Sequence, residues 1–345
     1  MRCLTLANEL RRIGAECVFL CRDHLGNLVS ALRQQGYVVN VLPIGLEDYI
    51  PQRNNTEQSD TLSITVEQDA GLSVDTLELW SPDWLIVDHY GIDFVWERMA
   101  RGSARHLMVI DDLADRSHEC DLLLDQNLVA TFETRYEGLV PENCQLLLGP
   151  PFALLQPQYA KLHRKIRERR GRVRRVLVYF GGADQNNLTG MVVKSFLELQ
   201  PLDVKLYVVI NSTNPHADEI KAMISARTSL TLYTDLPSLA PLMMEADLAF
   251  GAGGATTWER CCLGLPSIVI TLAENQVPVA SELNRRGLIR WLGRQEDVSS
   301  ARVKQVLREM LKETPSSAWP ELRHQLVDGL GVNRAANMLR LENWS

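Results

Sequence analysis

Short apolar runs rich in Val, Ile and Leu alternate with helical patterns along the chain, in two successive series. Such runs are typical of buried strands in parallel sheets, and the patterns between them are typical of crossover helices. The first series lies at residues 16–21, 37–42, 83–88, 106–111 and 120–125, and the second at 174–180, 203–210, 229–234, 247–251 and 266–271. The pattern therefore predicts an α/β protein of two lobes, each built on a parallel sheet.

A strongly basic segment separates the two series. Nine of the fifteen residues from 161 to 175 are Lys or Arg. Such a run is more typical of a solvated helix and linker than of a phosphate or acidic-membrane site. We therefore expect an N-terminal domain at 1–160, a basic linker at 161–173, a C-terminal domain at 174–330 and a final helix at 331–345 that could cross back to the first domain. The polar residues 51–61 are expected to form an exposed loop.

The start of the chain departs from the usual order of a doubly wound domain, which opens with a strand, a loop and then a helix. The apolar positions of a helix are already present at Leu4, Leu6, Ala7, Leu10 and Ile13. This pattern ends at Gly14, a residue type that commonly terminates helices. The pattern therefore lacks the expected first strand of the N-terminal domain and the loop after it.

The strongest candidate site follows the fourth strand of the second series. Gly253 and Gly254 let backbone N–H groups approach an anion closely, and a helix that starts at Thr256 or Thr257 adds the partial positive charge of its N-terminus. Diphosphate is the natural ligand of such a turn. Glu259, early in this helix, could accept hydrogen bonds from ribose hydroxyls. The alternative is a glycine turn made only for tight packing, and we favour nucleotide binding.

Two further turns place polar residues at the carboxyl ends of strands in the second series. Gly181 and Gly182 follow its first strand and are predicted to bring backbone close to the same ligand. The polar residues 274–276, among them Asn275, follow its last strand. Because the carboxyl ends of parallel strands share one sheet edge, these turns predict a cleft between the domains. The alternative, for Asp184 or an Asn at 186–187 as for 274–276, is helix capping.

The first series contributes a second group of candidates. Asp88, His89 and Tyr90 follow a buried strand and offer acid, base or hydrogen-bonding chemistry. Adjacent residues at a strand end point to opposite faces, so we do not predict a dyad of Asp88 and His89. Farther along, the segment 110–121 carries potential metal ligands at Asp111, Asp112, Asp115 and His118. Their spacing matches no metal motif, and loop capping is favoured.

Composition narrows the functions further. The formal charge of −7 argues against broad nucleic-acid binding, which needs Lys and Arg clustered over a whole face. The seven cysteines include no Cys-x-x-Cys pair and are typical of reduced cytosolic thiols. The N-terminus lacks the apolar stretch of a signal peptide, and no run approaches the roughly 20 apolar residues of a membrane helix. We therefore expect a cytoplasmic protein with no membrane insertion, metal or cofactor.

Several segments together resemble one enzyme family: MRCLTLA, VDHYGID, IDDLADR-x-H-x-CDLLLDQN, GPPFALLQPQY, FGGAD-x-N and GAGGATTWERCCLGLP. They look like the UDP-2,4-diacetamido-2,4,6-trideoxy-β-L-altropyranose hydrolases of pseudaminic acid biosynthesis, over nearly the whole chain. The resemblance implies a GT-B-like fold related to MurG-type glycosyltransferases, with a UDP-sugar between two Rossmann-like domains. It also implies metal-independent hydrolysis, in which water attacks the anomeric carbon and UDP leaves.

The resemblance assigns roles by motif. Tyr90 and Asn275 would contact the sugar or the attacking water, Glu259 the ribose, and Gly253 and Gly254 the diphosphate. The family also has a strand and a G-x-G-H loop before the segment that matches MRCLTLA, and the His of that loop is its expected general base; neither occurs in this sequence. Three functions stay open: the hydrolase, with a start codon farther upstream, a glycosyltransferase using the same cleft, and a non-catalytic UDP-sugar-binding protein.

Overall fold

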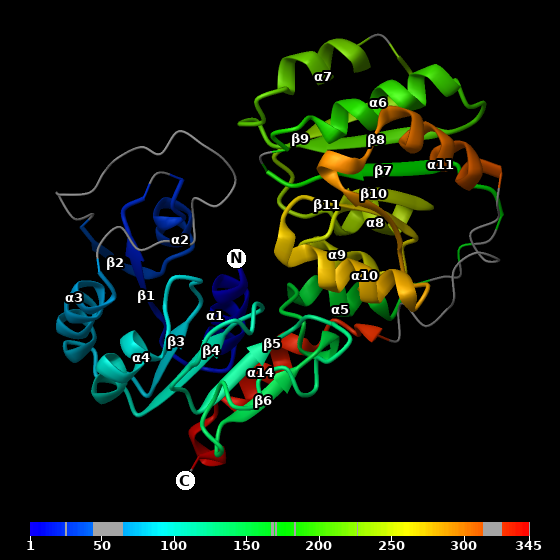
Figure 1. Cartoon of the computed structure of the whole chain (residues 1–345). Helices are drawn as coiled ribbons and strands as arrows, with labels where there is room; N and C mark the ends of the chain where they lie inside the picture. Colours follow the sequence, from blue (N-terminus) through cyan, green and yellow to red (C-terminus); the bar gives the residue numbers. More distant parts are fainter. Residues whose placement is uncertain are drawn as a thin grey trace. The chain divides into compact units, whose positions relative to one another are not determined.

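A computed structural model describes the chain except for residues 25, 44–64, 167, 168, 170, 183, 226, 313–325 and 345. The chain divides into two compact units, shown in Figure 1. Unit 1 consists of Met1–Asn127, Thr131–Leu154 and Leu330–Ser345, and unit 2 of Leu128–Ala130 and Leu155–Gly329. The main change of unit thus follows Leu154, and the segment expected to be a linker, 161–173, falls within unit 2. The loop expected at 51–61 lies outside the described residues.

The described residues of unit 1 form six strands, paired in parallel, and the helices around them. Its strands are β1 (Val18–Arg22), β2 (Val38–Leu42), β3 (Trp84–Val87), β4 (His106–Ile110), β5 (Leu122–Asp125) and β6 (Gln145–Leu148). Its α-helices are α1 (Arg2–Arg12), α2 (Val29–Gln34), α3 (Val66–Glu78), α4 (Phe94–Ala100) and α14 (Gly331–Met338). Its short 3-10 turns are Arg101–Ser103, Pro150–Phe152 and Leu341–Asn343.

The described strands of unit 1 form two sheets. One consists of β1 and β2, and the other has the order β3-β4-β5-β6. All of these pairs are parallel, as continuous apolar runs predict. The first element of the chain is α1, which begins at Arg2 and follows the apolar stripe seen in the sequence.

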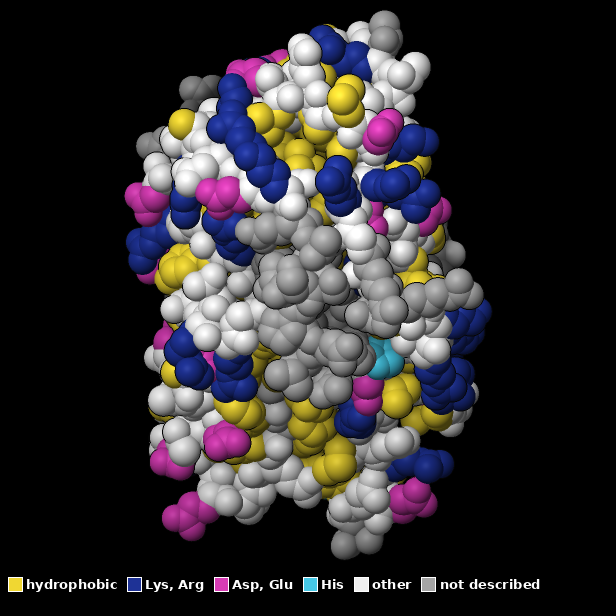
Figure 2. Space-filling view, turned by 90° about the vertical axis from the view of Figure 1, so that its right-hand side faces the viewer, with side chains coloured by type: hydrophobic (Ala, Val, Ile, Leu, Met, Phe, Trp, Pro, Cys, Tyr) yellow, Lys and Arg dark blue, Asp and Glu magenta, His cyan; other side chains and the backbone are white. Residues whose placement is uncertain are grey.

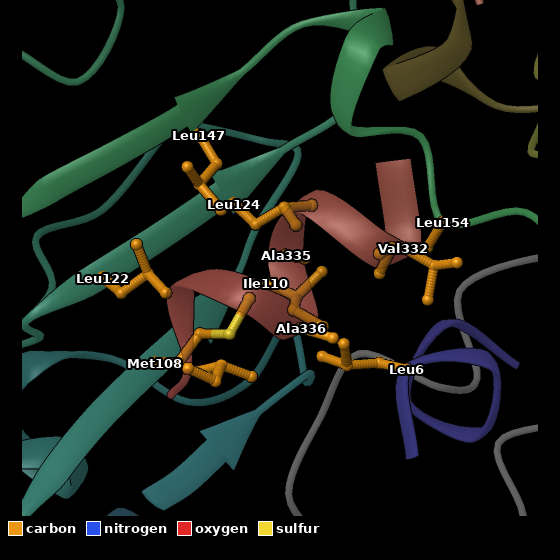
Figure 3. Packing of buried hydrophobic residues seen from close by; sticks show 11 residues of the cluster. Leu6, Met108, Ile110, Leu122, Leu124, Leu147, Leu154, Val332, Ala335 and Ala336 are labelled. Atoms are coloured by element: carbon orange, nitrogen blue, oxygen red, sulfur yellow. The ribbon is translucent and has the colours of Figure 1, made fainter. Parts of the chain in front are cut away.

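The core of unit 1 joins the two ends of the chain. Figure 3 shows α14 lying across the four-stranded sheet, with small side chains turned toward the strands. The buried cluster includes Leu6 of α1, Met108 and Ile110 of β4, Leu122 and Leu124 of β5, Leu147 of β6, and Val332, Ala335 and Ala336 of α14. A Cβ at Gly331 would lie 2.3 Å from the carbonyl oxygen of Ala153. Glycine at the start of α14 therefore permits this close packing.

Unit 2 is a second parallel α/β unit. Its strands are β7 (Arg175–Tyr179), β8 (Lys205–Ile210), β9 (Leu230–Thr234), β10 (Leu248–Ala252), β11 (Ser267–Thr271) and β12 (Arg290–Arg294). Its α-helices are α5 (Pro157–His163), α6 (Leu188–Leu199), α7 (Ala217–Ile224), α8 (Ala240–Glu245), α9 (Thr256–Cys262), α10 (Val277–Arg285) and α11 (Ser300–Lys312). Its described residues also include two 3-10 turns, η3 (Glu274–Gln276) and η4 (Gln295–Asp297).

The strand order of unit 2 contains one reversal. The order is β12-β11-β10-β7-β8-β9, so the chain first moves outward from β7 to β9 and then restarts beside β7 with β10. Ligands of open parallel sheets bind beyond the carboxyl ends of the strands at such a switch point. The strands on either side of it are β7 and β10, which precede the two glycine turns found in the sequence.

The basic segment 161–175, which we expected to be solvated, includes an arginine that is bonded within unit 2. The guanidinium of Arg169 donates hydrogen bonds of 2.8–3.0 Å to the backbone carbonyls of Met243, Ala246, Leu263 and Gly264. Burial lowers the pKa of Arg169 to about 10. One cation of the run is therefore a structural tie within unit 2, which the charge pattern alone does not reveal.

The surface carries charges of both signs. On the face drawn in Figure 2, Lys and Arg side chains lie among Asp and Glu side chains. Among the described residues, no helix combines the length and the apolar character needed to span a bilayer.

Candidate functional site

The switch point of unit 2 brings the two glycine turns to adjacent strands. β10 pairs with β7 in parallel, and Gly251 lies opposite Tyr179. The turn with Gly181 and Gly182 follows β7, while the turn with Gly253 and Gly254 follows β10. Both turns therefore leave the same edge of the sheet, as the sequence predicts, and the structure adds that their strands are neighbours.

The turn after β10 also meets the segment after β11. A Cβ at Gly253 would lie 3.1 Å from Gln276 Oε1 and 3.2 Å from Thr271 Cγ2. The same Oε1 accepts a hydrogen bond of 3.0 Å from the backbone N–H of Leu272. The side chain of Gln276 thus lies close to Gly253, while its hydrogen bond stays within the segment after β11. Asn275, its neighbour in η3, has an exposed side chain.

Helix α9 begins at Thr256, one of the two expected positions, and no side chain caps its N-terminus. Beneath its first turn lies Arg260, whose side chain is fully enclosed by the protein. Its Nη2 donates to the carbonyl oxygen of Ala252 at 2.7 Å and to Thr257 Oγ1 at 3.0 Å. Its Nε has no hydrogen-bond partner among the described atoms. The helix start thus lies over a buried cation held by neutral oxygens.

Arg260 also explains a glycine. A Cβ at Gly251 would lie 2.6 Å from Arg260 Nη1 and 2.8 Å from the carbonyl oxygen of Tyr179. Burial lowers the pKa of Arg260 to about 10, so the guanidinium is still charged near neutral pH. The sequence analysis did not select Arg260. The available signal is its position beside Trp258, Cys261 and Cys262, which makes α9 apolar on the faces around it.

Glu259 occupies the first turn of α9 and is partly buried. Its carboxyl interacts with the hydroxyl of Tyr159, which belongs to α5 and is 1% exposed. Burial raises the pKa of the Glu259 carboxyl to about 7, against the hydrogen bond from Tyr159 and the charge of Arg260, which lower it. The structure thus places a carboxylate that titrates near neutral pH next to the turn. Tyr159 is a second residue that the sequence analysis did not select.

The turn after β7 is built differently. Asp184, which is 5% exposed, accepts hydrogen bonds of 2.9 Å from the backbone N–H groups of Leu188 and Thr189. Asn187 accepts a third from the N–H of Gly190, also at 2.9 Å. Both side chains cap α6, so the capping alternative is correct for Asp184 and Asn187. Gly181 and Gly182 remain predicted ligand contacts beside this capped helix.

Tyr90 lies in unit 1, beyond β3, in a cluster that includes Arg2. The guanidinium of Arg2 forms ion pairs with Asp88 at 2.5 Å and with Asp112 at 2.8 Å. Tyr90 is partly buried, and burial together with the Asp112 charge raises the pKa of its phenol. Tyr90 therefore stays protonated near neutral pH and is a hydrogen-bond donor.

The contacts of Asp88, His89 and Asp111 in the structure are an ion pair and loop hydrogen bonds. Asp88 forms an ion pair with Arg2, and Nδ1 of His89 accepts a hydrogen bond from the N–H of Gly91 at 3.0 Å. The two side chains thus have different partners, and we predicted no dyad between them. The carboxylate of Asp111 accepts from the N–H of Ala114 at 2.8 Å, which is the loop capping that we favoured. In the described part of the chain, no group of three or more His, Cys, Asp or Glu residues could hold a metal ion.

Comparison with known proteins agrees with this architecture. Residues 176–325 match the family described as Glycosyltransferase family 28 C-terminal domain. The UDP-2,4-diacetamido-2,4,6-trideoxy-beta-L-altropyranose hydrolase of Campylobacter jejuni is 25% identical over 203 residues, which are 59% of this chain and 71% of that protein. The match to this hydrolase shows the resemblance that the sequence motifs indicate.

Solved structures show the same fold. MurG of Acinetobacter baumannii has a TM-score of 0.64 at 13% identity and covers 99% of this chain and 95% of its own. Arabidopsis thaliana UGT89C1 complexed with UDP-L-rhamnose has a TM-score of 0.62 at 12% identity, covering 98% of this chain and 95% of its own. The chain therefore has a GT-B glycosyltransferase-like fold of two parallel α/β domains, and its sequence resembles the UDP-diacetamido-trideoxy-altropyranose hydrolases.

Proposed function

We propose that the chain hydrolyses a UDP-linked 2,4-diacetamido-2,4,6-trideoxy sugar to the free sugar and UDP, as a step of pseudaminic acid biosynthesis. The observation that carries this proposal is the uncapped turn after β10, with the buried Arg260 beneath it and Glu259 beside it. The similarity to the Campylobacter jejuni hydrolase supports the choice of sugar and of water as the acceptor.

The turn suits the leaving group of this reaction. When the bond between the sugar and the diphosphate breaks, negative charge accumulates on the diphosphate. Backbone N–H groups at Gly253 and Gly254, close to a helix N-terminus, stabilise that charge in the transition state. Arg260 adds a full positive charge from below, in a buried position where water screens it weakly.

The other predicted roles divide between the ribose and the sugar. Glu259 would accept hydrogen bonds from the ribose hydroxyls, and it does so best when ionised. Tyr90 and Asn275 are proposed to contact the sugar or the attacking water, a role that rests on their motifs. Because the phenol of Tyr90 stays protonated, we assign it hydrogen-bond donation and not proton abstraction. The reaction is proposed to need no metal.

The test is UDP release without an acceptor. The purified chain is incubated with the UDP-linked sugar, UDP is measured by a coupled assay and the free sugar by NMR. We expect release of both products at a rate at least about tenfold above that of a Tyr90→Phe, Asn275→Ala double variant, because both hydrogen-bonding groups are lost in the variant. Equal rates for the two proteins would contradict the proposal.

A glycosyltransferase is the second candidate, favoured by the match of residues 176–325 to a glycosyltransferase family. It uses the same diphosphate and ribose contacts but transfers the sugar to an acceptor hydroxyl. It therefore predicts that UDP appears only when an acceptor is added. The same assay, run with and without candidate acceptors, separates the two functions.

A further inference from the structure

Two cysteines of unit 1 lie side by side where the strands β5 and β6 begin. Cys120 is two residues before β5 and Cys144 is one residue before β6, and their Sγ atoms are 3.6 Å apart. Both are free thiols, and both contact the buried apolar cluster that contains Leu123 and Tyr136. The two residues are 24 positions apart in the sequence. Strand pairing therefore brings the thiols together, and no motif of the sequence indicates the pair.

The backbone around this pair suits a disulfide bond. Leu122 pairs with Gln145 in the parallel ladder, and the N–H of Gln145 donates to the carbonyl oxygen of Asp121 at 2.8 Å. Continued by one residue, this register sets Asp121 beside Cys144, so Cys120 is offset from Cys144 by one position. Neighbouring strands lie about 4.8 Å apart and rise about 3.3 Å per residue, which gives a Cα separation of about 6 Å. Disulfides span Cα separations of about 4.4–6.8 Å.

Formation of the bond requires the two sulfurs to move closer, because an S–S bond is about 2.05 Å long. Cys120 is 3% exposed and precedes β5, which has strands on both sides. Cys144 is partly exposed and precedes β6, which lies at the edge of the sheet. A turn before Cys144 is closed by the bond from its N–H to the carbonyl oxygen of Pro141, at 2.9 Å. We therefore expect the movement to come from Cys144 and this turn.

The two thiols also differ in their access to reagents. A reagent in water can reach Cys144, which is partly exposed, whereas Cys120 is enclosed by the protein. The hydrogen bond with Cys144 and burial raise the pKa of Cys120, so Cys120 stays protonated while Cys144 is a thiol. Since the thiolate is the nucleophile in disulfide exchange, Cys144 reacts first and Cys120 second.

We propose that Cys144 and Cys120 are a redox pair that a low-molecular-weight disulfide, such as oxidised glutathione, converts reversibly to an intramolecular disulfide. The Cys144 thiolate attacks one sulfur of the oxidant, so a mixed disulfide forms and one glutathione leaves as a thiol. Cys120 then loses its proton to water and attacks Cys144 Sγ, and the second glutathione leaves. The chain gives up two protons and two electrons, which reduce the oxidant to two thiols. This inference is independent of the proposed function.

The disulfide would close a ring around residues 121–143. This ring includes Arg135 and Tyr136, whose side chains donate to the carboxylate of Asp125 at 2.7 Å and 3.2 Å. A cross-link restricts the unfolded chain more than the folded one. Oxidation therefore stabilises unit 1 and fastens the loop between β5 and β6 at both of its ends.

The experiment incubates the folded chain with oxidised glutathione at neutral pH and blocks the remaining thiols with an alkylating reagent. Peptides are then mapped by mass spectrometry without reduction. We expect a cross-linked pair of peptides that joins Cys120 to Cys144 and is lost after treatment with dithiothreitol. Cys120→Ser should keep one glutathione on Cys144, because the second thiol is missing. In Cys144→Ser, Cys120 should stay unmodified, because the oxidant cannot reach it.

A matched control exists in the same unit. Cys17 and Cys21 are also partly exposed free thiols of unit 1. Cys17 Sγ donates to the carbonyl oxygen of Ala7 at 3.8 Å instead of to a thiol. A double variant with Cys17→Ser and Cys21→Ser should form the cross-link between Cys120 and Cys144 to the same extent as the natural chain.

Thermal unfolding supplies a second readout. Oxidation of the natural chain should raise the unfolding midpoint of unit 1 by about 5–10 °C, and dithiothreitol should reverse the rise. Glutathione that remains on Cys144 in the natural chain, or a cross-link that forms only in urea, would overturn the proposal. Both results come from the natural chain, so they decide the matter even if Cys120→Ser fails to fold. A cross-link that lowers the midpoint would overturn the stabilising effect of oxidation.

Discussion

The two glycine turns of unit 2 follow adjacent strands of one sheet, yet their chemistry is opposite. After β7, the side chains of Asp184 and Asn187 accept three backbone N–H groups at the start of α6. After β10, no side chain caps α9, and a buried arginine lies beneath the turn. In the first turn, side-chain oxygens occupy the backbone N–H groups, whereas in the second no side chain caps the helix, although Glu259 lies beside the turn.

This difference supports a choice between the two glycine turns as the proposed phosphate site. Both turns place glycines next to the switch point of the sheet. A glycine pattern in the sequence indicates this position and nothing about which turn binds phosphate. A carboxylate that already caps the helix uses the N–H donors and repels a second anion. We therefore expect the diphosphate at Gly253 and Gly254, with Gly181 and Gly182 at most lining the site.

We call the uncapped turn after β10, with Gly253 and Gly254, the open turn, and the turn after β7, with Gly181 and Gly182, the capped turn. The largest expected effect comes from removing the buried charge of Arg260 beneath the open turn. Arg260→Met keeps the length of the side chain but loses the cation. We expect the affinity for UDP to fall about ten- to 100-fold, whereas that for uridine, which has no phosphates, should change less than about threefold. Calorimetry with both ligands measures the two affinities.

Arg169→Met is the matched control. Arg169 is a partly buried cation of unit 2 that likewise donates to backbone carbonyls and has a pKa lowered to about 10. Arg169 donates to the carbonyls of Met243, Ala246, Leu263 and Gly264, whereas Arg260 donates to the carbonyl of Ala252 at the turn. Its loss should reduce stability without changing the UDP to uridine ratio. Equal changes of that ratio in both variants would rule out a specific role for Arg260.

The second effect concerns the backbone of the open turn. In Gly254→Ala, the nearest atom to the new Cβ is Gln276 Nε2 at 3.8 Å, an ordinary contact, so the fold should tolerate the change within about 0.5 kcal/mol. A methyl group where phosphate oxygens approach should nevertheless lower UDP affinity about tenfold.

Gly182→Ala makes the same change in the capped turn, where the new Cβ would meet the end of a flexible side chain, Asn211 Nδ2, at 2.9 Å. We expect a clearly smaller loss of UDP affinity there. A larger loss from Gly182→Ala than from Gly254→Ala would reverse the assignment of the two turns.

The sequence predicts the central strands well because they are buried on both faces. β4, β5, β7, β10 and β11 appear as continuous apolar runs, and the structure places them inside their sheets. It does not reveal β6 and β12, which lie at sheet edges. Except for Leu147, their residues are exposed or only partly covered, so neither QLLL nor RWLGR was selected as a buried strand.

The candidate site likewise contains some residues that the sequence reveals and others that it does not. The glycines and Glu259 are visible in the sequence because a turn and a helix start are local features. Tyr159 and Arg260 are not, for different reasons. The contact of Tyr159 with Glu259 depends on how α5 packs near α9, and no spacing encodes it. Arg260 is adjacent to the predicted residue, but a charged side chain is normally assigned to solvent.

The third prediction concerns the pH dependence of stability next to the open turn. The pKa of Glu259 is about 7 in the folded chain and has an ordinary value of 4.5. Between these values the folded state binds more protons than the unfolded state, so stability falls as pH rises from about 4.5 to 7. Urea unfolding from pH 4.5 to 8 should show this decline for the natural chain relative to Glu259→Gln. Parallel profiles for the two proteins would mean that the carboxyl is not shifted.

The smallest effect on binding is expected where the helix is already capped. Asp184→Ala removes the acceptor of two N–H groups at the start of α6, so the free energy of unfolding should fall by about 1–2 kcal/mol in urea titrations. UDP affinity should change less than about twofold, because this carboxylate serves the helix and not the ligand. Asn187→Ala, which removes the third acceptor, should behave alike. A loss of UDP affinity above about tenfold with stability intact would show instead that the turn after β7 binds the nucleotide through its polar side chains.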